Sequence, residues 1–142
     1  MYQLLDPNAV GQKNFAALER AGVRQRKAWQ WLGETDRLIV ELAGHGSTVR
    51  AIARAVGLTP GTVSRRLAAI HHRLGDPVTL ALLDPDTPVP DGTRAVALLH
   101  QVGKLSPGLI ARRLGMSHVV VREQLRYARG IALGLLVKRA GQ

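Results

Sequence analysis

The sequence has 142 residues, with 20 lysines and arginines against 10 aspartates and glutamates, which gives a formal net charge of +10. The length fits one ordinary domain or two very small ones. Because 46% of the residues are hydrophobic, the chain can bury a core, which excludes a disordered basic tail. Excess positive charge on a chain that can fold favours a polyanionic partner, most often nucleic acid.

The absence of cysteine excludes disulfide frameworks, thiolate zinc sites and cysteine nucleophiles. No charged segment followed by an apolar stretch opens the chain, so no signal peptide is expected. The longest apolar runs, such as residues 79–83, are far shorter than the ~20 residues that a bilayer span needs. We therefore expect a cytoplasmic protein without membrane contact. Its richness in alanine, arginine, glycine, leucine and valine, with little lysine, is typical of GC-rich bacterial or phage genomes.

Residues 1–33 are predicted to form an N-terminal basic helical extension, with a basic helix over 23–32. Two interpretations of this helix stay open. In the first, its charged face is solvated and Trp29 or Trp31 packs on the core. In the second, it is an arm that contacts DNA phosphates through Arg24, Arg26 and Lys27.

Residues 34–75 are predicted to form a unit of three helices. Thr35 is expected to cap the first helix, which ends in a Gly-His-Gly sequence at 44–46. Ser47 or Thr48 can begin the second helix.

The second helix of this unit is expected to end at Gly57, because a left-handed glycine commonly follows the last helical residue. Thr59 is then the cap of the third helix, and Pro60 suits its first position. Apolar residues recur at helical spacing along both helices and predict the buried face. They are Val49, Ile52, Ala53, Val56, Val63, Leu67 and Ile70.

Residues 76–91 contain four aspartates, no basic residue and four of the seven prolines of the chain. Proline interrupts helices and pushes the preceding residue towards an extended conformation. This stretch is therefore predicted to be an acidic, proline-rich linker that does not contact DNA.

Residues 92–142 are predicted to form a second unit with a C-terminal helix, because the sequence aligns with itself without gaps at an offset of 58. Residues 48–70 align with 106–128. The second unit repeats the pattern with Thr93, Gly115 and the cap Ser117. Identical residues occur at seven aligned pairs, whose second members are Thr93, Ile110, Ala111, Arg112, Gly115, Val121 and Leu125. No stretch alternates with the period of a strand, so the predicted fold is all-α, with two tandem three-helix helix-turn-helix units.

A short helix, a glycine turn and a second capped helix form the helix-turn-helix pattern. The stretch IARAVGLTPGTVSRRLAAIHHRL (52–74) resembles region four of bacterial sigma factors, with their IA…LG(I/L)S…GTV(K/S)xRL pattern. The stretch LIARRLGMSHVVVREQLRYAR (109–129) resembles the same superfamily less closely. The resemblances cover about residues 34–75 and 92–132.

A complete sigma factor also has regions, with aromatic residues, that bind and melt the promoter. This chain has only five aromatic residues, and it leaves no room for such regions beside the two units. Promoter melting is not expected, whereas RNA polymerase stays a candidate partner.

The resemblance implies that the last helix of each unit lies in the major groove, with its N-terminal residues at base edges. Arg65 and Arg122 are the candidates for bidentate contact with guanine, Glu123 for contact with cytosine, and Val119 for contact with a thymine methyl. The full set of candidate base-reading residues is Thr59, Pro60, Gly61, Ser64, Arg65, Ser117, His118, Val119, Arg122, Glu123 and Arg126. Ala68 also belongs to the predicted groove-facing surface. Candidate phosphate contacts, besides those of the N-terminal arm, are Arg50, Thr62, Arg66, Arg73, Arg112 and Arg113.

Structural interpretations compete with these assignments. The arginines can be solvated surface charges, Glu123 can pair with a neighbouring arginine, and the aliphatic parts of Arg54 and Arg112 can cover the helix pair. Enzymatic motifs fail, because residues 98–105 lack the first glycine and the hydroxyl of a phosphate-binding loop, and no nucleophile elbow occurs. We therefore expect no catalytic residue, no metal site and no cofactor.

The leading hypothesis is a bacterial or phage protein that binds double-stranded DNA in the cytoplasm, on the nucleoid. It would be a transcriptional regulator whose two units act as a covalent pseudo-dimer. Its site would be bipartite and asymmetric, with half-sites about 10 bp apart if the units occupy successive major grooves. Net positive charge is greatest in the second unit, which predicts that this unit supplies more of the affinity for DNA that is independent of sequence. The alternatives are a nucleoid-like architectural protein without sequence preference, and an adaptor for polymerase or phage packaging. Either a monomer or a homodimer is compatible with the sequence.

Overall fold

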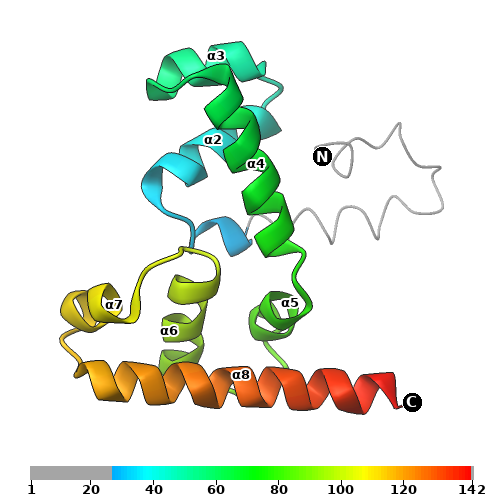
Figure 1. Cartoon of the computed structure of the whole chain (residues 1–142). Helices are drawn as coiled ribbons and strands as arrows, with labels where there is room; N and C mark the ends of the chain where they lie inside the picture. The colour runs from blue at the N-terminus through cyan, green and yellow to red at the C-terminus, as the bar shows by residue number, and fades with distance from the viewer. Residues whose placement is uncertain (1–26, 142) are drawn as a thin grey trace. The chain divides into compact units, whose positions relative to one another are not determined.

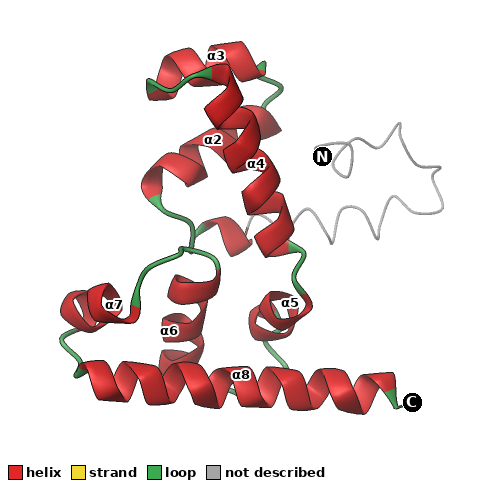
Figure 2. Cartoon of the chain, viewed as in Figure 1, coloured by secondary structure: helices red, strands yellow, loops and turns green. Residues whose placement is uncertain are grey.

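The computed structural model describes residues 27–141, and within this range all regular secondary structure is helical, with no strand (Figures 1 and 2). The predicted all-α fold is thereby confirmed. The chain divides into two compact units, residues 1–72 and 73–142, and the boundary falls inside one helix. The helices in chain order are α2 (Glu34–Gly44), α3 (Val49–Val56), α4 (Pro60–Leu74), α5 (Pro77–Leu83), α6 (Asp91–Gln101), α7 (Pro107–Leu114) and α8 (His118–Ala140).

Helix α2 begins two residues earlier than the predicted cap at Thr35 implies. The residue before its first turn is Gly33, and no side chain caps it. The prediction that Thr35 caps this helix is wrong, because Thr35 lies inside the first turn and is exposed. Glu34 and Asp36 in that turn place negative charge near the positive end of the helix dipole, which favours a start here without a side-chain cap. Ile39 and Val40 are the residues that α2 buries.

Trp29 is half-buried near the end of α2. A Cβ atom added to Gly44 would lie 3.4 Å from its Cη2 atom, so the missing side chain of this glycine leaves room for the ring. Ala28 and Leu32, on either side of Trp29, are buried. For this part of the predicted N-terminal helix, these observations favour packing on the core. Lys27 is exposed, while Arg24 and Arg26 lie outside the described residues.

Helix α4 buries residues at the spacing of a single helical face, with Val63, Leu67, Ile70 and Leu74 all less than 9% exposed. On its outer side the Arg66 guanidinium lies 3.2 Å from the Asp36 carboxylate, which links α4 to α2. The helix ends at Leu74, where the Gly-Asp-Pro sequence was predicted to stop it.

The structure differs from the predicted linker at residues 76–91, because half of this stretch is helix α5. The Asp76 carboxylate accepts hydrogen bonds from the amides of Val78 and Thr79, and Pro77 takes the first helical position, where its missing N–H breaks no bond. The helix buries Val78, Thr79, Ala81 and Leu82 and packs against α6 and α8. Residues 76–91 therefore contribute buried side chains to the core of the second unit.

The turn after α5 is held by one side chain from α6. The Arg94 guanidinium donates hydrogen bonds to the backbone carbonyls of Leu82, of Asp84 at 2.8 Å and of Thr87 at 2.7 Å. The buried Thr87 hydroxyl donates to the Ala81 carbonyl at 2.5 Å. The carbonyls of Asp84 and Thr87 also accept from the amides of Thr87 and Val89, so side-chain and backbone donors together hold this turn.

Helix α8 organises the second unit, with α5, α6 and α7 packed along it (Figure 1). Val121, in its first half, is fully buried in a cluster with Val96, Ile110 and Ala111. Ala128 and Ala132 are buried further along the helix. The predicted recognition helix and the predicted C-terminal helix are therefore one continuous helix of 23 residues.

Replacing Arg94 with alanine is expected to destabilise the second unit by about 2–3 kcal/mol, since several carbonyl groups lose a charged donor. Urea unfolding followed by circular dichroism measures the change. Arg113→Ala is the matched control, because Arg113 is exposed on α7, and its effect should stay below about 0.5 kcal/mol. Equal stability of Arg94→Ala and the unmodified protein would contradict the role given to Arg94.

Candidate nucleic-acid interface

Two helix pairs, α3–α4 and α7–α8, have the same local geometry at positions 58 residues apart. Helices α3 and α7 both have eight residues, and α4 and α8 begin at equivalent positions. The Thr48 hydroxyl oxygen accepts a hydrogen bond from the amide three residues on at 3.1 Å, and Ser106 does the same at 3.2 Å. Thr59 and Ser117 cap the second helix of each pair in the same way, at 3.2 and 3.1 Å.

The turn between the helices also matches. Gly57 has φ +73° and Gly115 has φ +63°, both in the left-handed region. The amide of the next residue donates back to an alanine carbonyl five residues earlier, at 3.0 Å from Leu58 to Ala53 and at 2.9 Å from Met116 to Ala111. The same alanine carbonyl also accepts from the amide of the glycine, so two successive amides close the end of each helix.

Equivalent residues of the two pairs are buried. Ile52 and Ile110 are at most 1% exposed, and Val63 and Val121 are fully buried. Ala53 and Ala111, an identical pair of the 58-residue repeat, are also buried. Fixed caps, a fixed turn and this buried set determine which side of α4 and of α8 faces outward.

The predicted base-reading residues of the first pair lie together on the outward side of the start of α4. Thr59, Pro60, Gly61, Ser64, Arg65 and Ala68 are exposed. The Arg65 guanidinium donates a hydrogen bond to the Thr62 hydroxyl oxygen at 3.2 Å. Thr62 was predicted to contact phosphate. It is half-buried, and its hydroxyl oxygen is bound by Arg65 within the same helix.

The second pair also exposes all its predicted base-reading residues, namely Ser117, His118, Val119, Arg122, Glu123 and Arg126. The Arg122 Nε atom lies 3.4 Å from the His118 Nε2 atom, one turn earlier on α8. Val119 is 66% exposed at the start of the helix. None of the ion pairs between described residues involves Glu123.

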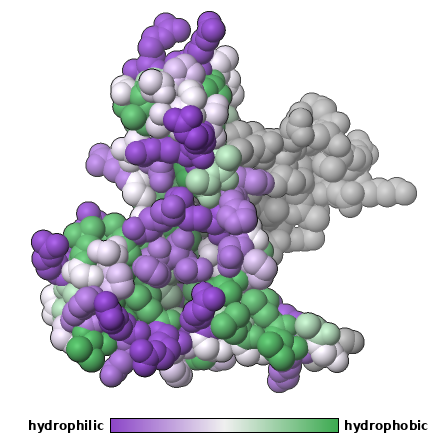
Figure 3. Space-filling view, viewed as in Figure 1, coloured by the Kyte–Doolittle hydropathy of each residue, from purple (hydrophilic) through white to green (hydrophobic). Residues whose placement is uncertain are grey.

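The predicted phosphate-binding residues separate into two groups. Arg50, Arg112 and Arg113 are exposed on α3 and α7, near the caps and turns described above. Arg66 is exposed but pairs with Asp36, and Arg73 is half-buried at the end of α4. The first group is therefore better placed for phosphates. In the space-filling view, hydrophilic side chains protrude over α3 (Figure 3).

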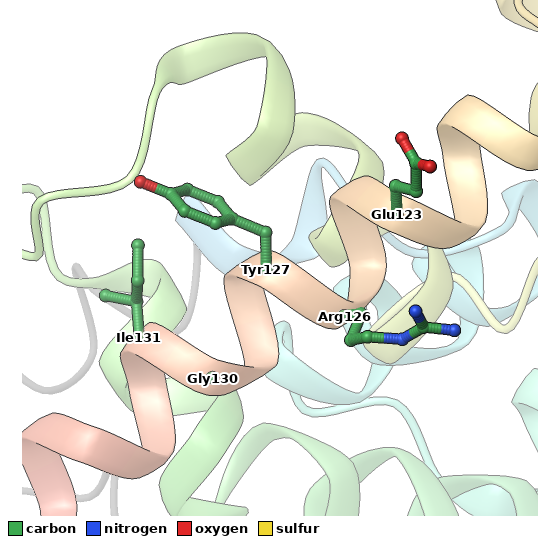
Figure 4. Close-up of a pocket in the computed structure, with 5 residues that line it drawn as sticks. All are labelled: Glu123, Arg126, Tyr127, Gly130 and Ile131. Carbon is green, nitrogen blue, oxygen red and sulfur yellow. The ribbon is translucent and has the colours of Figure 1, made fainter.

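A shallow hollow on α8 was not predicted from the sequence. It is lined by Glu123, Arg126, Tyr127, Gly130 and Ile131, and Tyr127 is 55% exposed (Figure 4). Figure 4 shows the side chains of Tyr127 and Ile131 projecting to one side of the helix and that of Arg126 to another. The three- and four-residue spacing of this set is the signal that could have identified it.

Within residues 27–141, no three histidine or acidic side chains gather in a way that could hold a metal ion. No helix in this range has the length and apolar character required to cross a membrane. Comparisons of the chain with models of protein families, with curated proteins and with solved structures give no match.

Gly115→Ala is expected to destabilise the second unit by about 1–2 kcal/mol, because a Cβ atom disfavours its left-handed backbone. Nothing lies within 4 Å of the added atom, so the cost comes from the backbone alone. Gly130→Ala, in the middle of α8 and equally uncrowded, should stabilise the protein by about 0.5–1 kcal/mol. Thermal unfolding of both variants tests the turn, and a shift of the same sign in both would contradict it.

Proposed function

We propose that this chain binds double-stranded DNA through α3–α4 and α7–α8 as two helix-turn-helix units, and that it regulates transcription in a bacterium or phage. It would act in the cytoplasm, on the nucleoid. The observation that carries the proposal is the shared geometry of caps, left-handed glycine and buried residues in the two helix pairs. A helix pair of this kind is a common way to present a helix to the major groove.

The side chains on the outward face of α4 have the chemistry that base reading needs. A guanidinium can donate two hydrogen bonds to the O6 and N7 atoms of guanine, and Arg65 is exposed near the start of the helix. Hydroxyl groups and backbone amides at helix starts suit phosphate oxygens, which fix the register of a protein on the duplex.

The outward face of α7 and the first half of α8 supports strong electrostatic attachment. Five exposed arginines lie there with a single acidic residue, Glu123. They are Arg112, Arg113, Arg122, Arg126 and Arg129. Each phosphate contact releases counterions, so this unit would supply much of the affinity that is independent of sequence.

The same arginines favour the second candidate function, an architectural protein that binds duplexes without sequence preference. Selection of bound duplexes from a random pool, repeated at two salt concentrations, separates the two. An enriched motif at both concentrations supports the regulator. Binding without enrichment that weakens steeply with salt supports the architectural protein. RNA polymerase remains a candidate partner. The test is whether this chain binds to the purified polymerase.

Arg65→Ala and Arg122→Ala are expected to weaken binding to the selected duplex by roughly 10- to 100-fold each, since each removes a bidentate base contact. Footprinting should show lost protection in a different half-site for each variant. Arg37→Ala is the control of equal charge change, because Arg37 is exposed on α2 and pairs with Glu41. If both variants lost protection equally over the whole site, the prediction that Arg65 and Arg122 contact separate half-sites would be contradicted.

A further inference from the structure

Arg65 is the end of a chain of hydrogen bonds at the start of α4. The Thr59 hydroxyl donates to the Thr62 hydroxyl oxygen at 2.8 Å, and the Thr59 oxygen accepts from the Thr62 amide at 3.2 Å. The Thr62 oxygen in turn accepts from the Arg65 guanidinium at 3.2 Å. A hydroxyl oxygen has two acceptor sites, so Thr62 can hold both partners at once.

Gly61 gives the guanidinium its place against the helix. A Cβ atom built on Gly61 would lie 3.5 Å from the Arg65 Nη1 atom, which is ordinary contact distance. The arginine side chain therefore runs back along α4 towards its N-terminus, as helical side chains tend to do. Any side chain longer than alanine at position 61 would compete with the guanidinium for this space.

The equivalent positions of α8 contain none of these features. Val119 stands at the position of Gly61, Val120 at that of Thr62 and Glu123 at that of Arg65. Val119 and Val120 are exposed and offer no hydrogen-bond acceptor. Acceptor, space and arginine thus occur together in the first unit and are absent together from the equivalent positions of the second, where Arg122 lies one position earlier and contacts His118 instead.

Resting on the proposed function, we infer that Thr62 and Gly61 are positioning residues that hold Arg65 ready to contact guanine, and so determine base specificity in the first unit. Gly61, which has no side chain to read a base, then acts through the space that it leaves for Arg65. A free arginine side chain has many rotamers, and binding in one geometry costs the entropy of the others. An arginine already held along the helix loses less of this freedom when it meets the base. The held guanidinium also lies near the N-terminal end of the recognition helix, the part that enters the groove.

The test uses the full chain and its selected duplex, together with duplexes in which each base pair is changed in turn. For the unmodified protein, the pair that Arg65 reads should be preferred by roughly 5- to 100-fold. Thr62→Val keeps the shape but removes the acceptor, and should reduce this preference about 3- to 10-fold. Its affinity for unrelated duplexes should change less than about 2-fold, because exposed arginines supply that binding and the half-buried Thr62 hydroxyl is occupied by Thr59 and Arg65.

Thr62→Ser restores the hydroxyl and should restore the preference, a result that a purely structural role of the threonine methyl would not give. Gly61→Leu leaves the hydroxyl in place but fills the space of the guanidinium, and should also lose the preference. Thr35→Val makes the same chemical change as Thr62→Val at an exposed position of α2 and should have no effect. Circular dichroism confirms that each variant is folded.

The possible results separate this inference from the proposed function. If the unmodified protein shows no base preference, both are overturned. If Arg65→Ala loses the preference while Thr62→Val and Gly61→Leu keep it, Arg65 reads DNA without being positioned, and only this inference fails. Failure of Thr62→Ser to restore the preference also overturns it.

Discussion

The turn between two short helices is the constraint on which the rest of each helix pair depends. Three residues separate α3 from α4, so the chain must reverse direction without room for an ordinary loop. A left-handed glycine ends the first helix, and two residues later a hydroxyl caps the next. With the turn fixed at both ends, burial of Ile52 and Val63 leaves one outward face for α4. The exposure of Arg65 follows from these backbone requirements.

Features that depend on neighbouring residues could be predicted from the sequence, whereas those that depend on distant contacts could not. The caps Thr48, Thr59 and Ser117 and the two left-handed glycines act within four residues, so local spacing predicts them. The predicted linker fails for two reasons. The start of α5 at Asp76 and Pro77 is an exception, a local signal that the acidic, proline-rich composition obscured. In addition, Arg94 reaches carbonyl groups seven to twelve residues away, which no local pattern indicates. Thr35 was mistaken for a cap because an acidic first turn can begin a helix without one.

For the candidate interface, the sequence predicted which residues are exposed but not how they are held. Helical periodicity decides exposure, and every predicted base-reading residue is exposed. The interactions of Arg65 with Thr62, of Arg66 with Asp36 and of Arg122 with His118 depend on side-chain rotamers that periodicity does not determine. Arg66 is an example. Its charge suggested a phosphate contact, but in the structure its guanidinium pairs with the Asp36 carboxylate.

The two candidate base readers also differ in register. Arg65 and Arg122 are 57 residues apart, whereas the caps, glycines and buried residues are 58 apart. One helical position corresponds to a rotation of about 100° and a rise of about 1.5 Å, so relative to their own caps the two arginines point in different directions. A duplex read by both units would therefore present its guanines differently in the two half-sites. In the proposed function, the asymmetry of the DNA site follows from this single-residue difference as much as from the different residue types.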